Sequence, residues 1–167
     1  DIVRQGLQLL TNLTHRGATG YDPKLGDGAG LLMQVPDAFM RAEADKLNIA
    51  LPAEGEYGVG MVFLPQKAKN IKICEDMFAK VIAEEGQTLL GWREVPVNCS
   101  NIATAAQEVE PVVRQIFIGA KAGISQNVFE TKLFVIRRRV KLAITAMQLQ
   151  DAVNLYIPSL SSRTIVY

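Results

Sequence analysis

The stretch 14–32, with the sequence THRGATGYDPKLGDGAGLL, most constrains how this chain can fold. It contains five of the thirteen glycines and the only histidine. Closely spaced glycines allow positive φ angles or the close approach of another backbone segment. A helical pattern with Val3, Leu7 and Leu10 on one face precedes the stretch, and an apolar run follows it at 31–33. The stretch therefore predicts a loop between a helix and a buried strand, and such loops often carry function.

The glycines of this stretch do not match common phosphate-binding motifs. The segment 26–31, GDGAGL, places its third glycine one position too early for a dinucleotide-binding fingerprint, and no clear strand precedes it. No G-x-x-x-x-G-K-[ST] sequence occurs, so a P-loop is not expected. One histidine and two distant cysteines, Cys74 and Cys99, cannot complete a zinc site without carboxylates, and we predict no metal site. The pattern alone leaves a purely structural glycine turn open as an alternative.

Hydrophobic periodicity predicts strands and helices along the rest of the chain. Strands are predicted at 28–35, 57–64, 87–95 and 111–119, helices at 36–47, 66–85 and 127–147, and a short helix within 98–109. The segments 156–158 and 163–167 are predicted to form two short strands or an interrupted hairpin. Asp37 is predicted to cap the helix 36–47, and Asn127 with Glu130 resembles a capping box for the longest helix. From 57 to about 147 the order is β-α-β-β-α, which is typical of a two-layer, ferredoxin-like α+β unit.

Apolar stripes on the predicted helices define the candidate core. They comprise Phe39, Met40, Ala44 and Leu47 on one helix, positions 71, 74, 78, 81 and 82 on the next, and Phe129, Leu133, Ile136, Val140 and Ile144 on the last. Gly58 and Gly60 are expected to permit close packing rather than phosphate binding. Trp92 is expected to pack in the core rather than to hold a substrate.

Composition bounds the class of protein. A hydrophobic content of 49% with 21% charged residues fits one globular domain, or one domain with a subdomain. The net charge of +1 gives no reason to expect nucleic acid or an anionic membrane as a partner. The sequence contains no apolar run of about eighteen residues that could span a bilayer. Two distant cysteines suit a reducing compartment, so a cytoplasmic location is predicted.

Several motifs together resemble a known family. The segment 7–32 carries Leu10-x-x-Leu13-x-His15-Arg16-Gly17, followed by Asp22 and the glycine run, and it is similar to the start of class II glutamine amidotransferase domains. The long form of the loop resembles more closely the N-terminal region of glutamate synthase large subunits. Further similar stretches are 57–65 (YGVGMVFLP), 90–96 (LGWREVP), 110–118 (EPVVRQIFI), 132–138 (KLFVIRR) and 159–167 (SLSSRTIVY). The resemblance thus extends over the whole chain.

The resemblance implies a fold. It suggests an α/β (α+β) chain that forms part of the four-layer α/β/β/α sandwich of N-terminal-nucleophile hydrolases. We expect 1–50 and 155–167 to belong to that core and 57–147 to form an inserted ferredoxin-like subdomain. The whole of 1–167 would then be a fragment of an amidotransferase domain.

The resemblance also implies a function for the parent protein. Such enzymes hydrolyse glutamine to glutamate and ammonia, and the ammonia passes to another domain for reductive transfer to 2-oxoglutarate. The FMN, the iron–sulfur clusters and NADPH or ferredoxin would bind elsewhere in the parent, whose other domains are expected partners; an oligomer is possible. An alternative is a non-catalytic amino-acid-binding or interaction module, which the β-α-β-β-α segment would also suit.

The family's nucleophile is an N-terminal cysteine whose own α-amine can act as general base. This chain begins with Asp1, and neither Cys74 nor Cys99 is N-terminal. The chain also lacks an Asn-Gly dipeptide of the kind that builds the family's oxyanion hole. We therefore expect no catalytic residue within this stretch and no glutaminase activity from it alone.

Four residues are predicted to line the site of the intact domain. Arg16 is expected to line the pocket and help position the nucleophile, while Gly17 allows the chain to pass close by. His15 is expected to make structural hydrogen bonds rather than to act as acid or base. Asp27 is expected to accept backbone hydrogen bonds in a tight turn rather than to ligate a cation.

Overall fold

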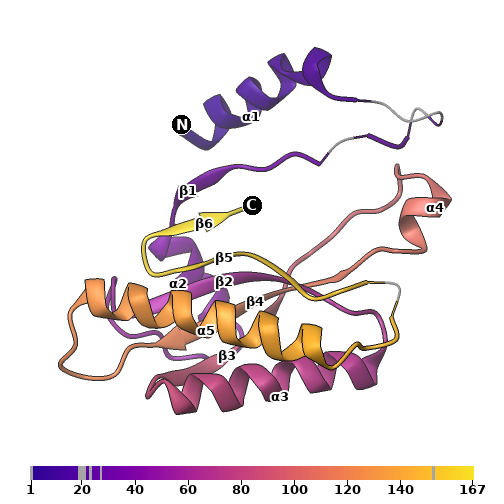
Figure 1. Cartoon of the computed structure of the whole chain (residues 1–167). Helices are drawn as coiled ribbons and strands as arrows, with labels where there is room; N and C mark the ends of the chain where they lie inside the picture. The colour runs from indigo at the N-terminus through magenta and orange to yellow at the C-terminus, as the bar shows by residue number, and fades with distance from the viewer. Residues whose placement is uncertain (1, 19–21, 23, 27, 152) are drawn as a thin grey trace.

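The computed structural model describes residues 2–18, 22, 24–26, 28–151 and 153–167 (Figure 1). The elements are α1 (Ile2–Asn12), the 3-10 turn η1 (Thr14–Arg16), β1 (Leu32–Gln34), α2 (Asp37–Asp45), β2 (Tyr57–Leu64), α3 (Ala68–Glu84), β3 (Thr88–Glu94), α4 (Thr104–Gln107), β4 (Val112–Gly119), α5 (Gln126–Ala146), β5 (Tyr156–Ser161) and β6 (Thr164–Val166). Each predicted helix and strand is found at its predicted place in the order. No helix in these described ranges has the length and apolarity needed to cross a membrane.

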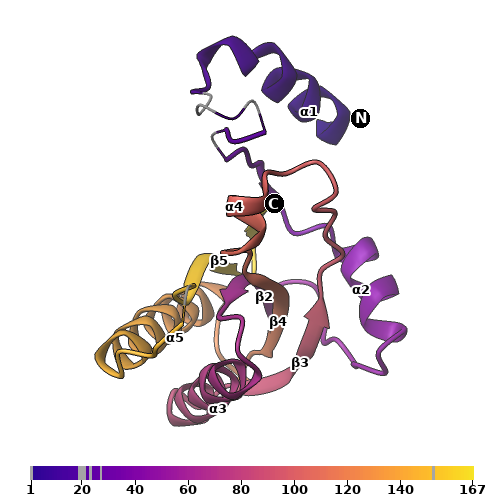
Figure 2. The same ribbon diagram turned by 90° about the vertical axis from the view of Figure 1, so that its right-hand side faces the viewer.

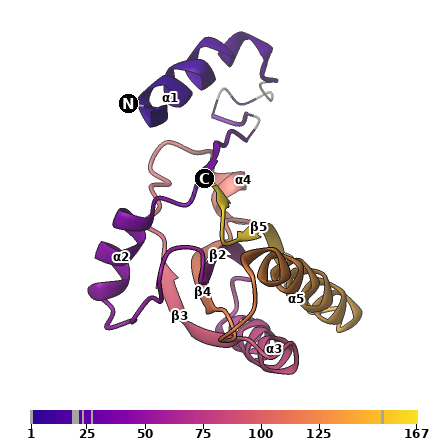
Figure 3. The same cartoon turned by 90° about the vertical axis from the view of Figure 1, so that its left-hand side faces the viewer.

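The larger sheet has four antiparallel strands in the order β3-β4-β2-β5. Its connections run β2-α3-β3-β4-α5-β5, so α3 and α5 each return the chain to a strand that lies beyond one intervening strand in the sheet. This is a ferredoxin-like arrangement, in which β5 adds the fourth strand to the predicted β-α-β-β-α order. Figures 2 and 3 show α3 and α5 together on one face of the sheet, with α2 on the other side. The division into core and insertion remains a prediction.

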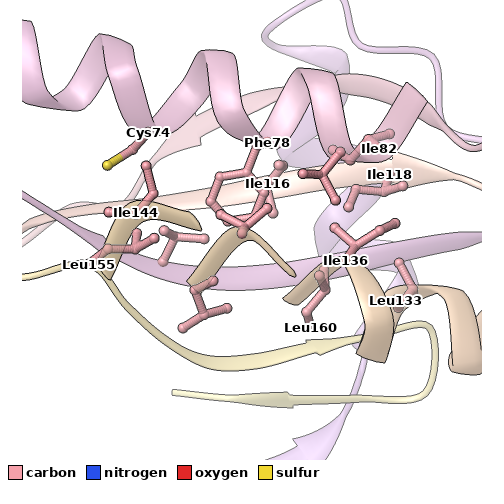
Figure 4. Close-up of a cluster of buried hydrophobic side chains, with 14 of the residues drawn as sticks. Cys74, Phe78, Ile82, Ile116, Ile118, Leu133, Ile136, Ile144, Leu155 and Leu160 are labelled. Carbon is pink, nitrogen blue, oxygen red and sulfur yellow. The ribbon is translucent and has the colours of Figure 1, made fainter. Parts of the chain in front are cut away.

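The main core lies between this sheet and the helices α3 and α5. Apolar side chains from both helices are fully or almost fully buried against the strands (Figure 4); they include Cys74, Phe78, Ile82, Phe129, Leu133, Ile136, Val140 and Ile144. Trp92 meets Phe78 edge to face, with ring centroids 5.3 Å apart. The predicted stripes of α3 and α5 and the packing role of Trp92 are confirmed. Periodicity identified them because residues three and four apart share one helix face.

The opposite face of the sheet carries a second, smaller core. Met40 of α2 and Ile165 of β6 are buried against Tyr57, Val59 and Phe117 of the sheet. Strands β1 and β6 pair antiparallel, with Met33 opposite Ile165, and form a second sheet over this face. In Figure 1, α1 lies above the β1–β6 pair, the four-stranded sheet lies below that pair, and α3 lies below the sheet; Figures 2 and 3 show α5 on the same face of the sheet as α3. The order of layers is thus helix, sheet, sheet, helix, with the four-stranded sheet and the helices α3 and α5 drawn mainly from 57–147, the range expected to be an insertion.

Two predicted helix caps are wrong. The N-cap residue of α2 is Pro36, and the Asp37 carboxylate instead accepts hydrogen bonds from Arg41 Nε at 2.9 Å and Tyr57 Oη at 2.8 Å. The N-cap of α5 is Ser125, two residues before the predicted cap Asn127, and its hydroxyl accepts a hydrogen bond from Val128 N. Glu130 accepts from the backbone of the β5–β6 turn instead. In both cases the carboxylate accepts a hydrogen bond from a donor that is distant in the sequence. A local sequence motif cannot predict such a partner.

Two further expectations need correction. Of the predicted buried face of α2, Phe39 and Leu47 are exposed, and only Met40 and Ala44 are buried. The first strand covers Leu32–Gln34 rather than 28–35, because its partner β6 is only three residues long. Gly30 lies beyond the strand, where a Cβ would come within 2.8 Å of the Tyr167 carbonyl oxygen.

Gly60 on β2 is packed closely by side chains from both neighbouring strands, in line with the predicted close packing. A Cβ there would lie 2.7 Å from Cγ2 of Ile116 and 2.9 Å from Cδ1 of Leu160. We expect Gly60→Ala to lower the free energy of unfolding by about 1–3 kcal/mol, since overpacking displaces both neighbours. Urea unfolding followed by circular dichroism measures this, with Gly28→Ala as control because that site has no atom within 4 Å among the described neighbours. An unchanged or raised free energy in Gly60→Ala would contradict the packing argument.

Asp151 anchors the start of α3 from the far end of the chain. Its carboxylate accepts hydrogen bonds from the backbone nitrogens of Gln66 and Lys67 at 3.2 and 3.1 Å and from Asn70 Nδ2 at 2.9 Å. Burial raises the pKa of this carboxyl, but these hydrogen bonds together outweigh it and bring the pKa to about 2. The anionic form is therefore the one that stabilises the helix N-terminus.

We expect Asp151→Asn to cost up to about 1 kcal/mol near neutral pH, because the amide keeps one acceptor oxygen but loses the negative charge at the helix N-terminus. Because the folded-state pKa lies below the ordinary value of about 3.9, the stabilisation is complete above about pH 4 and is lost as the pH falls towards about 2. The difference between variant and parent should therefore shrink over that interval in urea unfolding curves. Asp76→Asn, at an exposed surface pair with Lys72, is the matched control with little expected effect. A difference independent of pH would refute the assignment.

Candidate functional site

The turn η1 directly follows α1 and presents the predicted site residues. Arg16 N donates to the carbonyl of Leu13 at 2.8 Å, and Gly17 N donates to that of Thr14 at 3.2 Å. His15 Nδ1 lies 2.9 Å from the Asn12 carbonyl oxygen, so Nδ1 carries the proton in this contact. The side chains of His15 and Arg16 are exposed, and Gly17 has extended backbone angles (φ −76°, ψ 150°). The turn therefore fastens His15 to the helix end and leaves the Arg16 guanidinium accessible.

The return arm of the loop comes back beside this turn. A Cβ built on Gly26 would lie 3.7 Å from the carbonyl oxygen of Ala18, the residue after Gly17. The Asp22 carboxylate closes a local turn by accepting a hydrogen bond from Lys24 N at 2.9 Å. A contact of this kind was predicted for Asp27. Asp27 itself lies outside the described residues, so its predicted role remains a prediction.

Leu31 joins the loop to both neighbouring layers. Its backbone nitrogen donates to the Tyr167 carbonyl at 2.7 Å, and Tyr167 N donates back to the Leu31 carbonyl at 2.9 Å. Its side chain packs against α1 at Gly6, where an added Cβ would lie 3.0 Å from Leu31 Cδ2. Leu31 thus contacts both α1, which leads into η1, and the end of the β1–β6 pair. Sequence reasoning did not find this junction, because Leu31 and Tyr167 are far apart in the chain.

A hollow of about 490 Å³ lies beside the other end of the β1–β6 pair. Its lining residues are Gln34, Val35, Glu54, Gly55, Tyr57, Gln126, Ser162, Arg163 and Thr164. His15, Arg16 and Gly17 do not belong to this lining, so the structure does not bring the predicted site residues to that hollow. The candidate site is therefore the surface formed by η1 and the adjoining loop arm.

The cysteines are poorly suited to nucleophilic chemistry. Cys74 is fully buried on the inner face of α3, and burial raises the pKa of its thiol to about 11. The pKa of the Cys99 thiol is raised by its hydrogen bond to the Glu110 carboxylate. Both thiols therefore stay protonated near neutral pH. Within the described ranges, no group of three or more His, Cys, Asp or Glu side chains could hold a metal ion.

Comparison with known proteins defines the class to which this fold and loop belong. The family model of the class-II glutamine amidotransferases matches residues 1–167. The chain therefore belongs to the class II glutamine amidotransferase family, and its layered α/β architecture is part of an N-terminal-nucleophile hydrolase fold.

Three similar relatives are glutamate synthases. The chain is 49% identical over 168 residues to the glutamate synthase [NADPH] large chain of Bacillus subtilis (strain 168), covering 100% of the chain and 11% of that protein. It is 35% identical to the corresponding large chain of Azospirillum brasilense, again covering 100% of the chain and 11% of the relative. It is 38% identical to the chloroplastic ferredoxin-dependent glutamate synthase of Oryza sativa subsp. japonica, with coverage of 100% and 10%. The chain thus spans about a tenth of the length of these curated relatives.

Proposed function

We propose that this chain is part of the glutaminase portion of a glutamate synthase. In the parent protein, glutamine is hydrolysed to glutamate and ammonia, and the ammonia reacts with 2-oxoglutarate under reduction to give a second glutamate. The observation that carries the proposal is the match over the whole chain to glutamate synthases that differ in their named electron donors. The alternative of a non-catalytic module receives no such support, because the matched family is one of amidotransferases.

The proposed chemistry begins at the family's N-terminal cysteine. Its sulfur attacks the amide carbon of glutamine, the α-amine transfers a proton to the leaving nitrogen, and ammonia departs from a thioester that water then hydrolyses. In this scheme the exposed guanidinium of Arg16 lines the pocket and helps to orient the nucleophile. The contact of His15 with the Asn12 carbonyl supports a structural role for the imidazole, which keeps the turn in place.

The flavin, the iron–sulfur clusters and the reductant belong to other parts of the parent in this proposal. The described residues do not fit a cluster, since Cys74 is buried beneath α3 and Cys99 lies beside Glu110 in a separate loop. No reaction step is therefore assigned to these groups here. A cytoplasmic location and association into an oligomer remain predictions.

The proposal is tested in the full-length protein. We expect it to release one ammonia for each glutamine converted to glutamate, and to form glutamate from 2-oxoglutarate with either glutamine or added ammonia as nitrogen donor. A variant with serine in place of the N-terminal cysteine should keep only the ammonia-dependent reaction. Tight binding of glutamine without hydrolysis would instead favour the alternative of an amino-acid-binding module.

A further inference from the structure

A connected chain of polar side chains, buried at its middle members Arg93 and Gln115 and partly exposed at its ends Glu43 and Tyr167, crosses the face of the four-stranded sheet that α2 and the β1–β6 pair cover. Arg93 on β3 donates from Nε and from one terminal nitrogen to Glu43 Oε2 on α2, at 2.9 and 2.5 Å. Its other terminal nitrogen donates to Gln115 Oε1 on β4 at 3.1 Å. Gln115 Nε2 in turn donates to Tyr167 Oη at 3.1 Å. Four side chains from separate parts of the sequence thus form one connected network.

The donors and acceptors of this network can be assigned in only one way. Arg93 can only donate, so the Gln115 oxygen must face it and the Gln115 nitrogen must face Tyr167. Gln115 is fully buried and Arg93 nearly so, which makes each hydrogen bond costly to lose. Burial raises the pKa of the Tyr167 phenol, so it stays neutral near neutral pH. The position of the Tyr167 ring is therefore set by the sheet.

Tyr167 connects the network to the candidate site through its backbone contacts with Leu31. Its backbone makes both hydrogen bonds with Leu31, and its carbonyl closely approaches Gly30, where a Cβ would lie 2.8 Å away. The Leu31 side chain packs against α1 at Gly6, and α1 continues directly into the turn that carries Arg16. A physical path of hydrogen bonds and packing contacts therefore leads from Glu43 to the turn η1.

We propose that the network of Glu43, Arg93, Gln115 and Tyr167 is a positioning device for the glutaminase site, with the Gln115–Tyr167 hydrogen bond as its last link. This inference rests on the proposed function, because it assigns the candidate site to glutamine hydrolysis. The four residues act through Leu31 and α1 and do not contact the substrate. Loss of the last link releases the ring of Tyr167 and lets the pairing with Leu31 and the placement of η1 relax.

Tyr167→Phe in the full-length protein tests the proposal, since it removes only the phenolic oxygen and keeps ring and backbone. We expect kcat for glutamine-dependent ammonia release to fall about tenfold, because the buried Gln115 amide loses its partner and the site is slightly misplaced. The KM for glutamine, the ammonia-dependent synthesis and the melting temperature should stay close to those of the parent. Tyr156→Phe is the matched control, because Tyr156 on β5 is 55% exposed; it should behave as the parent.

Two results would overturn the inference while leaving the proposed function intact. One is unchanged glutamine-dependent kcat in Tyr167→Phe. The other is a parallel fall of both activities together with the melting temperature, which would indicate a merely structural role. If the parent protein and Tyr156→Phe both failed to release ammonia from glutamine while synthesis from added ammonia proceeded, the proposed function itself would be wrong, and this inference with it.

Discussion

Phe78→Ala is expected to lower the free energy of unfolding of this chain by about 3–5 kcal/mol. Phe78 is fully buried at the centre of the core between α3, α5 and the sheet, and its ring is the edge-to-face partner of Trp92. Its truncation leaves a cavity in the core. The surrounding strands and helices cannot move in to fill it, because the hydrogen bonds of the sheet and the packing of the helices hold them in place. Since small domains have total stabilities of about 5–15 kcal/mol, the variant should be close to unfolding.

Urea unfolding followed by far-ultraviolet circular dichroism measures this loss. Tryptophan fluorescence is less suitable, because the substitution removes a direct neighbour of Trp92 and changes the folded-state signal itself. Phe134→Ala provides the matched control: Phe134 lies on α5 and is 60% exposed, so the same truncation should change the free energy by less than about 1 kcal/mol. Equal losses at the two positions would mean that the core between the sheet and the helices is not the main source of stability.

The sequence predicted the parts of this fold that depend on local periodicity. The stripes of α3 and α5 follow the helical repeat, and β2 and β4 are largely apolar runs bounded by turn residues. Gly58 and Gly60 were interpretable because strand glycines mark close approach, here to Leu133 and to Ile116 with Leu160. These features are encoded within a few residues and do not depend on where the rest of the chain goes.

Features that depend on distant pairing were not predictable in the same way. The Asp37 and Glu130 carboxylates match local cap motifs, yet each is bound by tertiary donors, Tyr57 in one case and the β5–β6 turn in the other. The pairing of Leu31 with Tyr167 and the contact of Gln115 with Tyr167, 52 residues apart, join residues that are distant in the chain. A hydrogen bond between distant residues produces no periodic pattern in the sequence from which it could be predicted.

The candidate site shows the same limit. The motif around His15, Arg16 and Gly17 could be singled out because it resembles a family, and the structure places these residues together in η1. Their relation to a substrate could not be derived from pattern, because glycine-rich loops have many accessible backbone paths. The role of Arg16 therefore remains a prediction that kinetics must decide.

Arg16→Ala in the full-length protein is expected to lower glutamine-dependent turnover on the order of a hundredfold, the usual effect of removing one polar group that stabilises the reacting centre. Folding should be almost unaffected, because the Arg16 side chain is exposed and the turn is held by backbone hydrogen bonds at Leu13 and Thr14. Glutamate formation from 2-oxoglutarate and added ammonia should be unchanged, since supplied ammonia bypasses the glutaminase step. Ammonia release at saturating glutamine, measured beside that reaction, separates the two activities.

Arg138→Ala is the control for the loss of one positive charge, because Arg138 is exposed on α5, which lies against the far face of the four-stranded sheet from η1. It should leave both activities unchanged. If Arg16→Ala kept full turnover at saturating glutamine, Arg16 would be an ordinary surface arginine, and the glutaminase pocket would have to be sought away from η1. If both activities fell together, the arginine would support the structure of the domain rather than the placement of its nucleophile. Only selective loss of the glutamine-dependent reaction agrees with a guanidinium that lines the pocket.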